Sequence, residues 1–107
     1  MKEELTTTAF EIKGKKIMKN LGIVRGIIVR SRSIVGNIGA SIEALFGGNI
    51  ILYKELCEKA RKDAFEMMLE NAKELGANGV IGIRYDATDL GGGITEVLCY
   101  GTAVIVK

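Results

Sequence analysis

The sequence predicts an α+β protein in which a three-stranded antiparallel sheet has helices on one face, in the order β-α-α-β-β after a short N-terminal strand or arm. Three observations predict this fold. Two stretches near the ends of the chain are rich in Ile and Val, a long helical periodicity lies between them, and glycine-containing turns follow that helix. With 107 residues, we expect one domain spanning 1–107.

The N-terminal part contains a weak strand signal and then a strong one. Residues 6–17 have alternating Phe10 and Ile12 before a Lys-Gly-Lys turn, which favours a short strand or an arm. The stretch Leu21–Ser31 (LGIVRGIIVRS) predicts a strand whose two glycines, Gly22 and Gly26, permit a bulge or a close backbone approach. Both its faces are apolar, so we expect it to be covered on both sides; one face holds Ile23, Ile27 and Val29 and the other Val24 and Ile28.

A first helix is predicted from Ser33, whose hydroxyl can cap it, to the Gly47-Gly48 pair that can end it. Apolar residues recur at helical spacing, namely Ile34, Ile38, Ile42, Leu45 and Phe46. Gly36 and Gly39 weaken the helix by up to about 1 kcal/mol each relative to Ala. A partly looped segment is therefore an equally weighted alternative.

The second helix, Leu52–Leu75, is the clearest element. Its apolar stripe consists of Leu52, Leu56, Ala60, Ala64, Met67, Met68 and Leu75, and we expect the methionines and Phe65 to lie in the core. On the outer face, Glu55/Lys59 and Glu58/Lys62 are favourable i,i+4 pairs.

A hairpin completes the predicted sheet. Its strands are Val80–Asp86 and Ile94–Val106, joined through a turn at Gly91-Gly92-Gly93. The last strand is apolar on both faces, with Val97, Cys99, Ala103 and Ile105 on one and Leu98, Val104 and Val106 on the other. One helical layer covers only one sheet face, so we expect subunit contacts on the other.

Composition favours self-association and excludes several classes of function. The chain is 48% hydrophobic, with a mean hydropathy of +0.22, which is more apolar than a lone small domain needs. Its net charge of +2, with mixed signs, argues against a nucleic-acid partner. The absence of His excludes the commonest general base and His-containing zinc sites. With no secretory signal and no apolar stretch long enough for a bilayer span, we expect a cytoplasmic protein without membrane contact.

Polar residues inside apolar strands are the candidate ligand-binding residues, because a buried polar group needs a partner. Arg25 is one such polar residue, and the five that we take as candidates are Arg30, Arg84, Glu96, Tyr100 and Thr102. An Arg84–Glu96 pair could form across the hairpin, directly or diagonally according to register. We favour the interpretation that these groups satisfy one another at subunit boundaries; the alternative is a pocket for a small anionic or polar ligand.

Metal ligands are few in this chain. No C-x₂-C motif is present, and we expect Cys57 and Cys99 to be reduced core thiols, although symmetry could assemble either into a ring. Asp86, Asp89 and Glu96 near the hairpin loop could gather around a hard cation, but loop acids usually form solvated turns. No cofactor is expected.

Three motifs together resemble a known family. ELGANGVIGIRYD at 74–86, EVLCYGTAV at 96–104 and LGIVRGIIVRS near the start are similar to the YbjQ-like family of small bacterial proteins, which is labelled heavy-metal-binding without a recognised ligand motif. The resemblance covers Thr6 to the end. It implies a dodecin-like subunit that assembles into a homopentameric ring. This chain departs from the family pattern at Gly79 and Cys99, where Ala is more usual, which argues against Cys99 as a shared metal ligand.

Three functional hypotheses follow. The first is a non-enzymatic, cytoplasmic homo-oligomer, a pentamer by resemblance, that binds a small ligand or metal ion at subunit interfaces. The second is a purely structural or scaffolding ring without a ligand. The third, ranked last, is an enzyme that works through Arg, Glu and Tyr without His.

Overall fold

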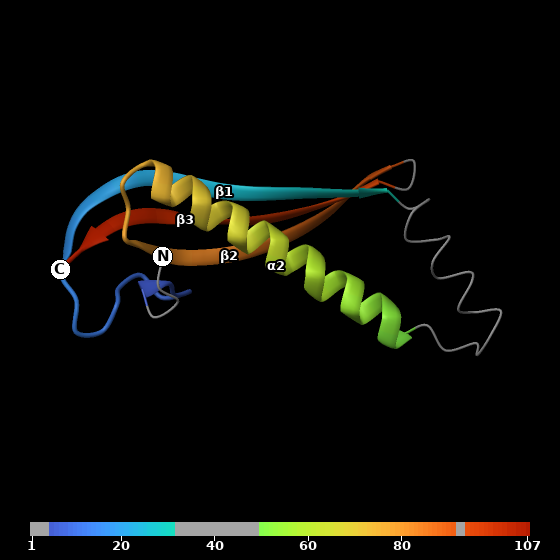
Figure 1. The fold of residues 1–107 in the computed structure, drawn as a ribbon, viewed down its shortest axis with the longest axis horizontal. Coiled ribbons are helices and arrows are strands. Elements are labelled where there is room, and N and C mark those ends of the chain that lie inside the picture. The colour runs from blue at the N-terminus through green and yellow to red at the C-terminus, as the bar shows by residue number, and fades with distance from the viewer. Residues whose placement is uncertain (1–4, 32–49, 92–93) are drawn as a thin grey trace.

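A computed structural model describes residues 5–31, 50–91 and 94–107. Within these ranges the elements are, in chain order, β1 (Ile17–Ser31), α2 (Ile50–Glu74), β2 (Gly79–Gly91) and β3 (Ile94–Val106) (Figure 1). The strands form one antiparallel sheet with the order β1-β3-β2. Helix α2 crosses one face of this sheet, so the predicted α+β class is confirmed (Figure 1).

Two predicted features lie outside the described residues. These are the first helix, between Ser33 and Gly48, and the middle of the Gly91-Gly92-Gly93 turn. Within the described ranges the sheet is packed by a single helix, α2, whose bounds agree with the predicted Leu52–Leu75 to within two residues at each end.

β3 has the predicted bounds, whereas β1 and β2 are longer than predicted. β1 begins at Ile17 rather than Leu21, because Lys16 and Lys107 exchange both backbone hydrogen bonds and extend the ladder to the end of β3. β2 continues to Gly91, since the pairing with β3 runs to the hairpin turn. The predicted irregularity at Gly22 is confirmed: the register shifts between Asn20 and Gly22, and Gly22 adopts a φ of +105°.

The N-terminal residues form an arm rather than a strand. Thr6 makes an isolated parallel bridge with Val80, and backbone hydrogen bonds connect Thr7 and Ala9 to the outer edge of β2 between Val80 and Ile83. The arm therefore protects the first part of one sheet edge. In Figure 1 it lies at the end of the molecule where β3 terminates.

The main core lies between α2 and the sheet. It contains Val24, Ala64, Met68, Ala72, Ala77, Val80, Ile83, Cys99 and Ala103, with Ile28 and Val97 packed against it. The predicted division of β1 and β3 into two faces is confirmed by these residues. Gly26 faces the backbone of α2, because a Cβ there would clash with the Ala64 carbonyl oxygen. A glycine at this point lets the helix backbone meet β1.

A smaller cluster covers one end of the opposite face. Ile81, Val104 and Val106 are buried there against Leu5, Ile12 and Ile17. The apolar residues of the N-terminal arm thus complete a second, local core. This core accounts for the burial of the last residues of β3 on both faces.

The outer surface of α2 differs from the prediction in two respects. Met67 and Leu75, assigned to the apolar stripe, are exposed, whereas Ala60, Ala64 and Met68 are buried as expected. The expected Glu55/Lys59 and Glu58/Lys62 ion pairs are absent from the described residues; Lys59 pairs with Asp63 and Arg61 with Glu58 instead. Several partners of opposite charge lie within one turn, and spacing alone does not select among them.

Candidate functional site

The sheet face opposite α2 has an apolar surface that no described residue covers. Ile23 and Val29 on β1 are 79% and 54% exposed, and Ile27 between them is also exposed. Strand alternation places Leu98, Tyr100 and Thr102 of β3 on the same face. Within one chain, the described residues thus cover β1 only on the side of α2, and the expected cover of its other side by a further subunit stays a prediction. We call this surface, built on Ile23, Ile27, Val29 and Leu98, the open face.

Polar residues form a cross-strand row at the centre of the open face. Tyr100 on β3 is directly opposite Arg25 on β1 and Arg84 on β2. Side chains in such positions lie about 5 Å apart at their Cβ atoms. Two guanidinium-bearing residues thus flank one phenol, with Thr102 one step along the same face. In the sequence, Arg25 stood out only as a polar residue in an apolar strand. Its position opposite Tyr100 now adds it to the candidate ligand-binding residues.

The guanidinium of Arg84 is turned toward the N-terminal arm. Its Nη1 donates hydrogen bonds to the carbonyl oxygens of Thr8 and Ile83, each at 2.8 Å, and its Cζ lies 5.7 Å from the centroid of the Phe10 ring. The predicted Arg84–Glu96 ion pair is wrong. Glu96 is opposite Thr88, four residues along the strand and therefore about 13 Å from the Tyr100 position.

Arg30 does not belong with the other four candidates, because it lies on the helix side of the sheet. Its Nη2 donates to Asp63 Oδ2 at 3.2 Å, and Lys59 Nζ bonds the same oxygen at 3.1 Å. Within one chain the five candidates are therefore divided between the two faces of the sheet: Arg30 lies on the helix side, and the open face holds Arg84, Glu96, Tyr100 and Thr102.

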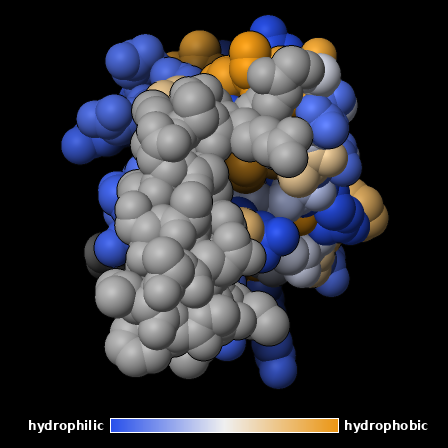
Figure 2. All heavy atoms as spheres, turned by 90° about the vertical axis from the view of Figure 1, so that its right-hand side faces the viewer, coloured by the Kyte–Doolittle hydropathy of each residue, from blue (hydrophilic) through white to orange (hydrophobic). Residues whose placement is uncertain are grey.

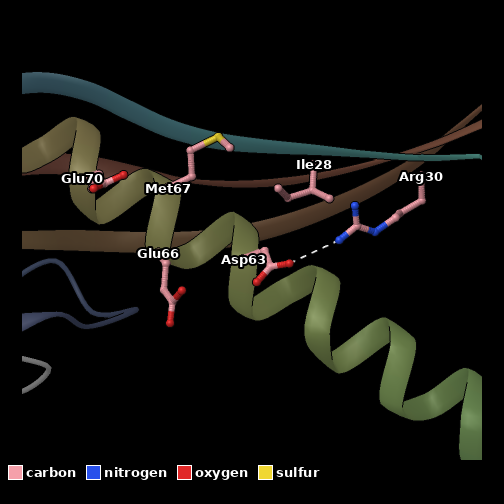
Figure 3. Close-up of a pocket in the computed structure, with 6 residues that line it drawn as sticks. All are labelled: Ile28, Arg30, Asp63, Glu66, Met67 and Glu70. Atoms are coloured by element: carbon pink, nitrogen blue, oxygen red, sulfur yellow. Dashed lines mark hydrogen bonds and ion pairs between the residues drawn. The ribbon is translucent and has the colours of Figure 1, made fainter.

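A shallow groove accompanies the Arg30–Asp63 pair. It has a volume of about 490 Å³ and is lined by Ile28, Arg30, Asp63, Glu66, Met67 and Glu70. Asp63 is turned toward Arg30, whereas Glu66 points away from it (Figure 3). Because the groove is open to solvent along its length and its ion pair is already satisfied, it offers little for binding a small molecule.

The two cysteines lie in different environments. Cys99 is fully buried beneath α2, and its Sγ lies 3.6 Å from Met68 Sδ. Burial raises the pKa of the Cys99 thiol, and burial together with the neighbouring Cys99 raises the pKa of Tyr85 to about 12. Cys57 is exposed on α2, so its assignment to the core was wrong. Cys57 directly follows Leu56 of the apolar stripe, so the helical periodicity did not show whether its thiol faces the core or solvent.

The acidic candidates do not converge. Asp86 and Glu96 share the open face as diagonal neighbours, because Asp86 is opposite Leu98. Asp89 Oδ1 accepts a hydrogen bond from the Gly91 amide at 2.9 Å, which confirms its interpretation as a turn former. Across the described ranges, no three Asp, Glu or Cys residues are grouped closely enough to hold a metal ion.

Hydrophobic surface also extends to the hairpin end of the sheet. Leu90 and Ile94, on either side of the turn, are exposed. Figure 2 looks at this end of the molecule and shows hydrophobic residues along its upper rim beside strongly hydrophilic ones. Among the described segments, no helix is long and apolar enough to cross a bilayer.

Comparison with known proteins identifies the family. A family model described as "Putative heavy-metal-binding", YbjQ_1, matches residues 5–107. UPF0145 proteins of Burkholderia thailandensis and Burkholderia mallei are each 61% identical over 101 residues, covering 94% of this chain and 91% of theirs. The chain therefore belongs to the YbjQ (UPF0145) family, as the motifs suggested, and its relatives are named without a reaction.

A solved structure supports the fold. A protein of unknown function from the DUF74 family of Pediococcus pentosaceus superposes with a TM-score of 0.61, covering 95% of this chain and 96% of that one. At 19% identity the likeness shows the α+β fold alone.

Proposed function

We propose that this protein is a non-enzymatic, cytoplasmic homo-oligomer, a ring of dodecin-like subunits, in which the open face is buried against further copies of the chain. The observation that supports this most directly is the exposure of Ile23, Ile27 and Val29 on the middle of a regular strand. A row of β-branched side chains in water is unusual for a monomer of this size, and its natural cover is another apolar surface.

The strand edges favour a cyclic arrangement. β1 and β2 are the two edges of the sheet, and since both are antiparallel to β3 they run in the same direction. Rotation about an axis brings β1 of one copy beside β2 of the next in parallel orientation, which is a heterologous contact that closes into a ring. The arm occupies β2 only as far as Ile83, so among described residues the edge beyond it is free to pair.

The central row of the open face is the proposed ligand site within this interface. Among the described residues, the side chains of Arg25 and Tyr100 have no hydrogen-bond or ion-pair partner. When a second copy covers these two side chains, they need a hydrogen-bond or ion-pair partner, because water no longer reaches them. A small anionic or polar ligand supplies that partner. Groups of the neighbouring subunit are the alternative, in which case the row is a structural strut and the ring has no ligand.

A metal ion at the interface is a second form of the same proposal. Asp86 and Glu96 supply two carboxylates per subunit on the open face, and rotation about a ring axis multiplies them. Two observations support a metal ion here: the family is described as heavy-metal-binding, and Asp86 and Glu96 are diagonal neighbours on paired strands.

Sedimentation velocity tests the interface. The parent chain should sediment as a discrete oligomer, and Ile23→Lys, which places a charge in the open face, should shift it to monomer. Met67→Lys is the matched control, because Met67 is exposed on the other side of the molecule, and it should leave the oligomer intact. A monomeric parent chain, or equal behaviour of the two variants, would contradict the proposal.

A further inference from the structure

Two large apolar side chains, Ile23 and Phe10, are much more exposed than any other that the structure describes. Ile23 on β1 is 79% exposed and Phe10 in the N-terminal arm is 75% exposed, whereas the next, Leu90, is 55% exposed. We propose that Phe10 of one copy packs against Ile23 of the next, so that the arm is an apolar anchor between subunits. This inference rests on the proposed ring and identifies one of its contacts.

The two side chains lie at opposite edges of the sheet but at nearly the same height along the strands. A Cβ on Gly82 would lie 3.3 Å from the Phe10 ring, so the ring packs over that glycine of β2. Ile81, the residue before it, is opposite Thr102 on β3, and Ile23 is opposite Thr102 from the other side. A rotation that sets β1 of one copy beside the arm of the next therefore brings Ile23 to Phe10.

This contact cannot form within one chain. β3 separates β1 from β2, which places the two edge strands about 10 Å apart, and the arm lies on the far side of β2 (Figure 1). Water therefore surrounds both side chains in the isolated subunit. A second copy of the chain supplies each of them with an apolar partner at the matching height, which favours a second copy over an unrelated protein as the occupant.

Backbone groups are already occupied at this height of the sheet. On β2, the amides of Gly82 and Ile83 donate to carbonyl oxygens of the arm at 2.8 and 3.1 Å. On β1, Asn71 Nδ2 of α2 donates to the Arg25 carbonyl oxygen at 2.7 Å. Strand pairing between β1 and β2 of two copies is therefore blocked here, which leaves side chains to make the contact.

The arm holds Phe10 in a fixed position. Arg84 Nη1 donates to the Thr8 carbonyl oxygen at 2.8 Å, and the same guanidinium lies 5.7 Å from the centroid of the Phe10 ring. On either side of Phe10 along the chain, Leu5 and Ile12 pack into the smaller core cluster. An aromatic ring that is held in place before association loses little conformational freedom on binding, and aromatic residues are enriched in interfaces.

Cross-linking tests the contact directly. In a Cys57→Ser background, where the remaining Cys99 is buried, chains with Phe10→Cys and chains with Ile23→Cys are co-expressed and treated with a short bifunctional maleimide. We expect a covalent dimer from the mixture and none from either chain alone, because each chain carries only one exposed thiol. Mixing Phe10→Cys with Leu90→Cys is the control, since position 90 is about 26 Å further along β2 and should give no dimer.

Sedimentation velocity over a range of concentrations measures what the contact contributes. Phe10→Ser should raise the concentration at which the oligomer dissociates by about 10-fold or more. Phe10→Leu, which stays apolar but loses the attraction between the ring and Arg84, should retain most of the affinity. Met67→Ser, on the helix side, should leave it unchanged. If Phe10 and Ile23 touch, the double variant Phe10→Ser/Ile23→Ser should weaken assembly by much less than the product of the two single effects.

Two results would overturn the contact while leaving the ring in place. One is an oligomeric parent protein whose Phe10→Cys and Ile23→Cys chains do not cross-link. The other is an oligomer that Phe10→Ser leaves as tight as the parent, with circular dichroism confirming that the variant is folded. A monomeric parent protein would instead overturn the proposed ring and this contact with it, including the case in which Phe10 serves a different partner.

Discussion

Adjacent methionines on α2 give a matched test of the core. Met68 is 0% exposed between the helix and the sheet, while Met67 is 39% exposed in the groove beside β1. Met68→Ala removes a fully buried side chain and leaves a cavity, so we expect a loss of about 2–5 kcal/mol in the free energy of unfolding. Met67→Ala should change it by about 1 kcal/mol or less, because the side chain is partly solvated in the folded state.

Urea denaturation of both variants at one protein concentration measures this difference. Holding the concentration fixed matters because assembly contributes to the apparent stability. The midpoint should fall for Met68→Ala with the m-value unchanged, and the melting temperature should fall by about 4–8 °C per kcal/mol. Equal losses for the two variants, or a larger loss for Met67→Ala, would refute the placement of α2 on the sheet.

Three further predictions concern single positions. Gly26→Ala should destabilise the subunit by about 1–3 kcal/mol in the same assay, because its Cβ would clash with the Ala64 carbonyl; an unchanged midpoint would mean that α2 and β1 are further apart. Glu96→Gln should leave the oligomer mass unchanged and reduce the retention of any bound metal ion in mass spectrometry, whereas a weakened oligomer would make Glu96 a structural contact of the interface and not a ligand. Cys57 should react with a thiol reagent at once, and Cys99 only after unfolding, because Cys99 is buried and its pKa is raised; equal rates would contradict this burial.

Alternation and helical periodicity were sufficient to predict most of the fold. The period of two assigned Val24 and Ile28 to one face of β1 and Ile23, Ile27 and Val29 to the other, and the packing agrees. The same alternation also contained the signal that separates Arg30 from the open face, since Arg30 shares the parity of Ile28. Because the polar residues were considered by residue type and not by the sheet face that each occupies, the separation of Arg30 from the open face was not predicted.

The pairing register could not be predicted, because it depends on irregularities in the backbone. The shift between Ile81 and Arg84 in the β2–β3 ladder places Arg84 opposite Tyr100 on the open face, whereas an unshifted ladder would place it opposite Cys99 on the helix side. A slip of one residue moves a side chain to the other face, and a glycine within a strand, such as Gly22 or Gly82, permits a bulge without requiring one. The start of β1 at Ile17 likewise depends on a backbone pairing with Lys107 that no side-chain pattern reveals.

The central claim, that the open face is a subunit interface, is tested most directly by native mass spectrometry of the purified protein at gentle and then raised collision energy. We predict a discrete oligomer, five times the 11.6 kDa chain mass if the ring is a pentamer. A reproducible extra mass lost at raised energy would support a ligand within the interface, and a bare oligomer would favour the structural ring. A stable monomer with the open face in water would contradict the claim.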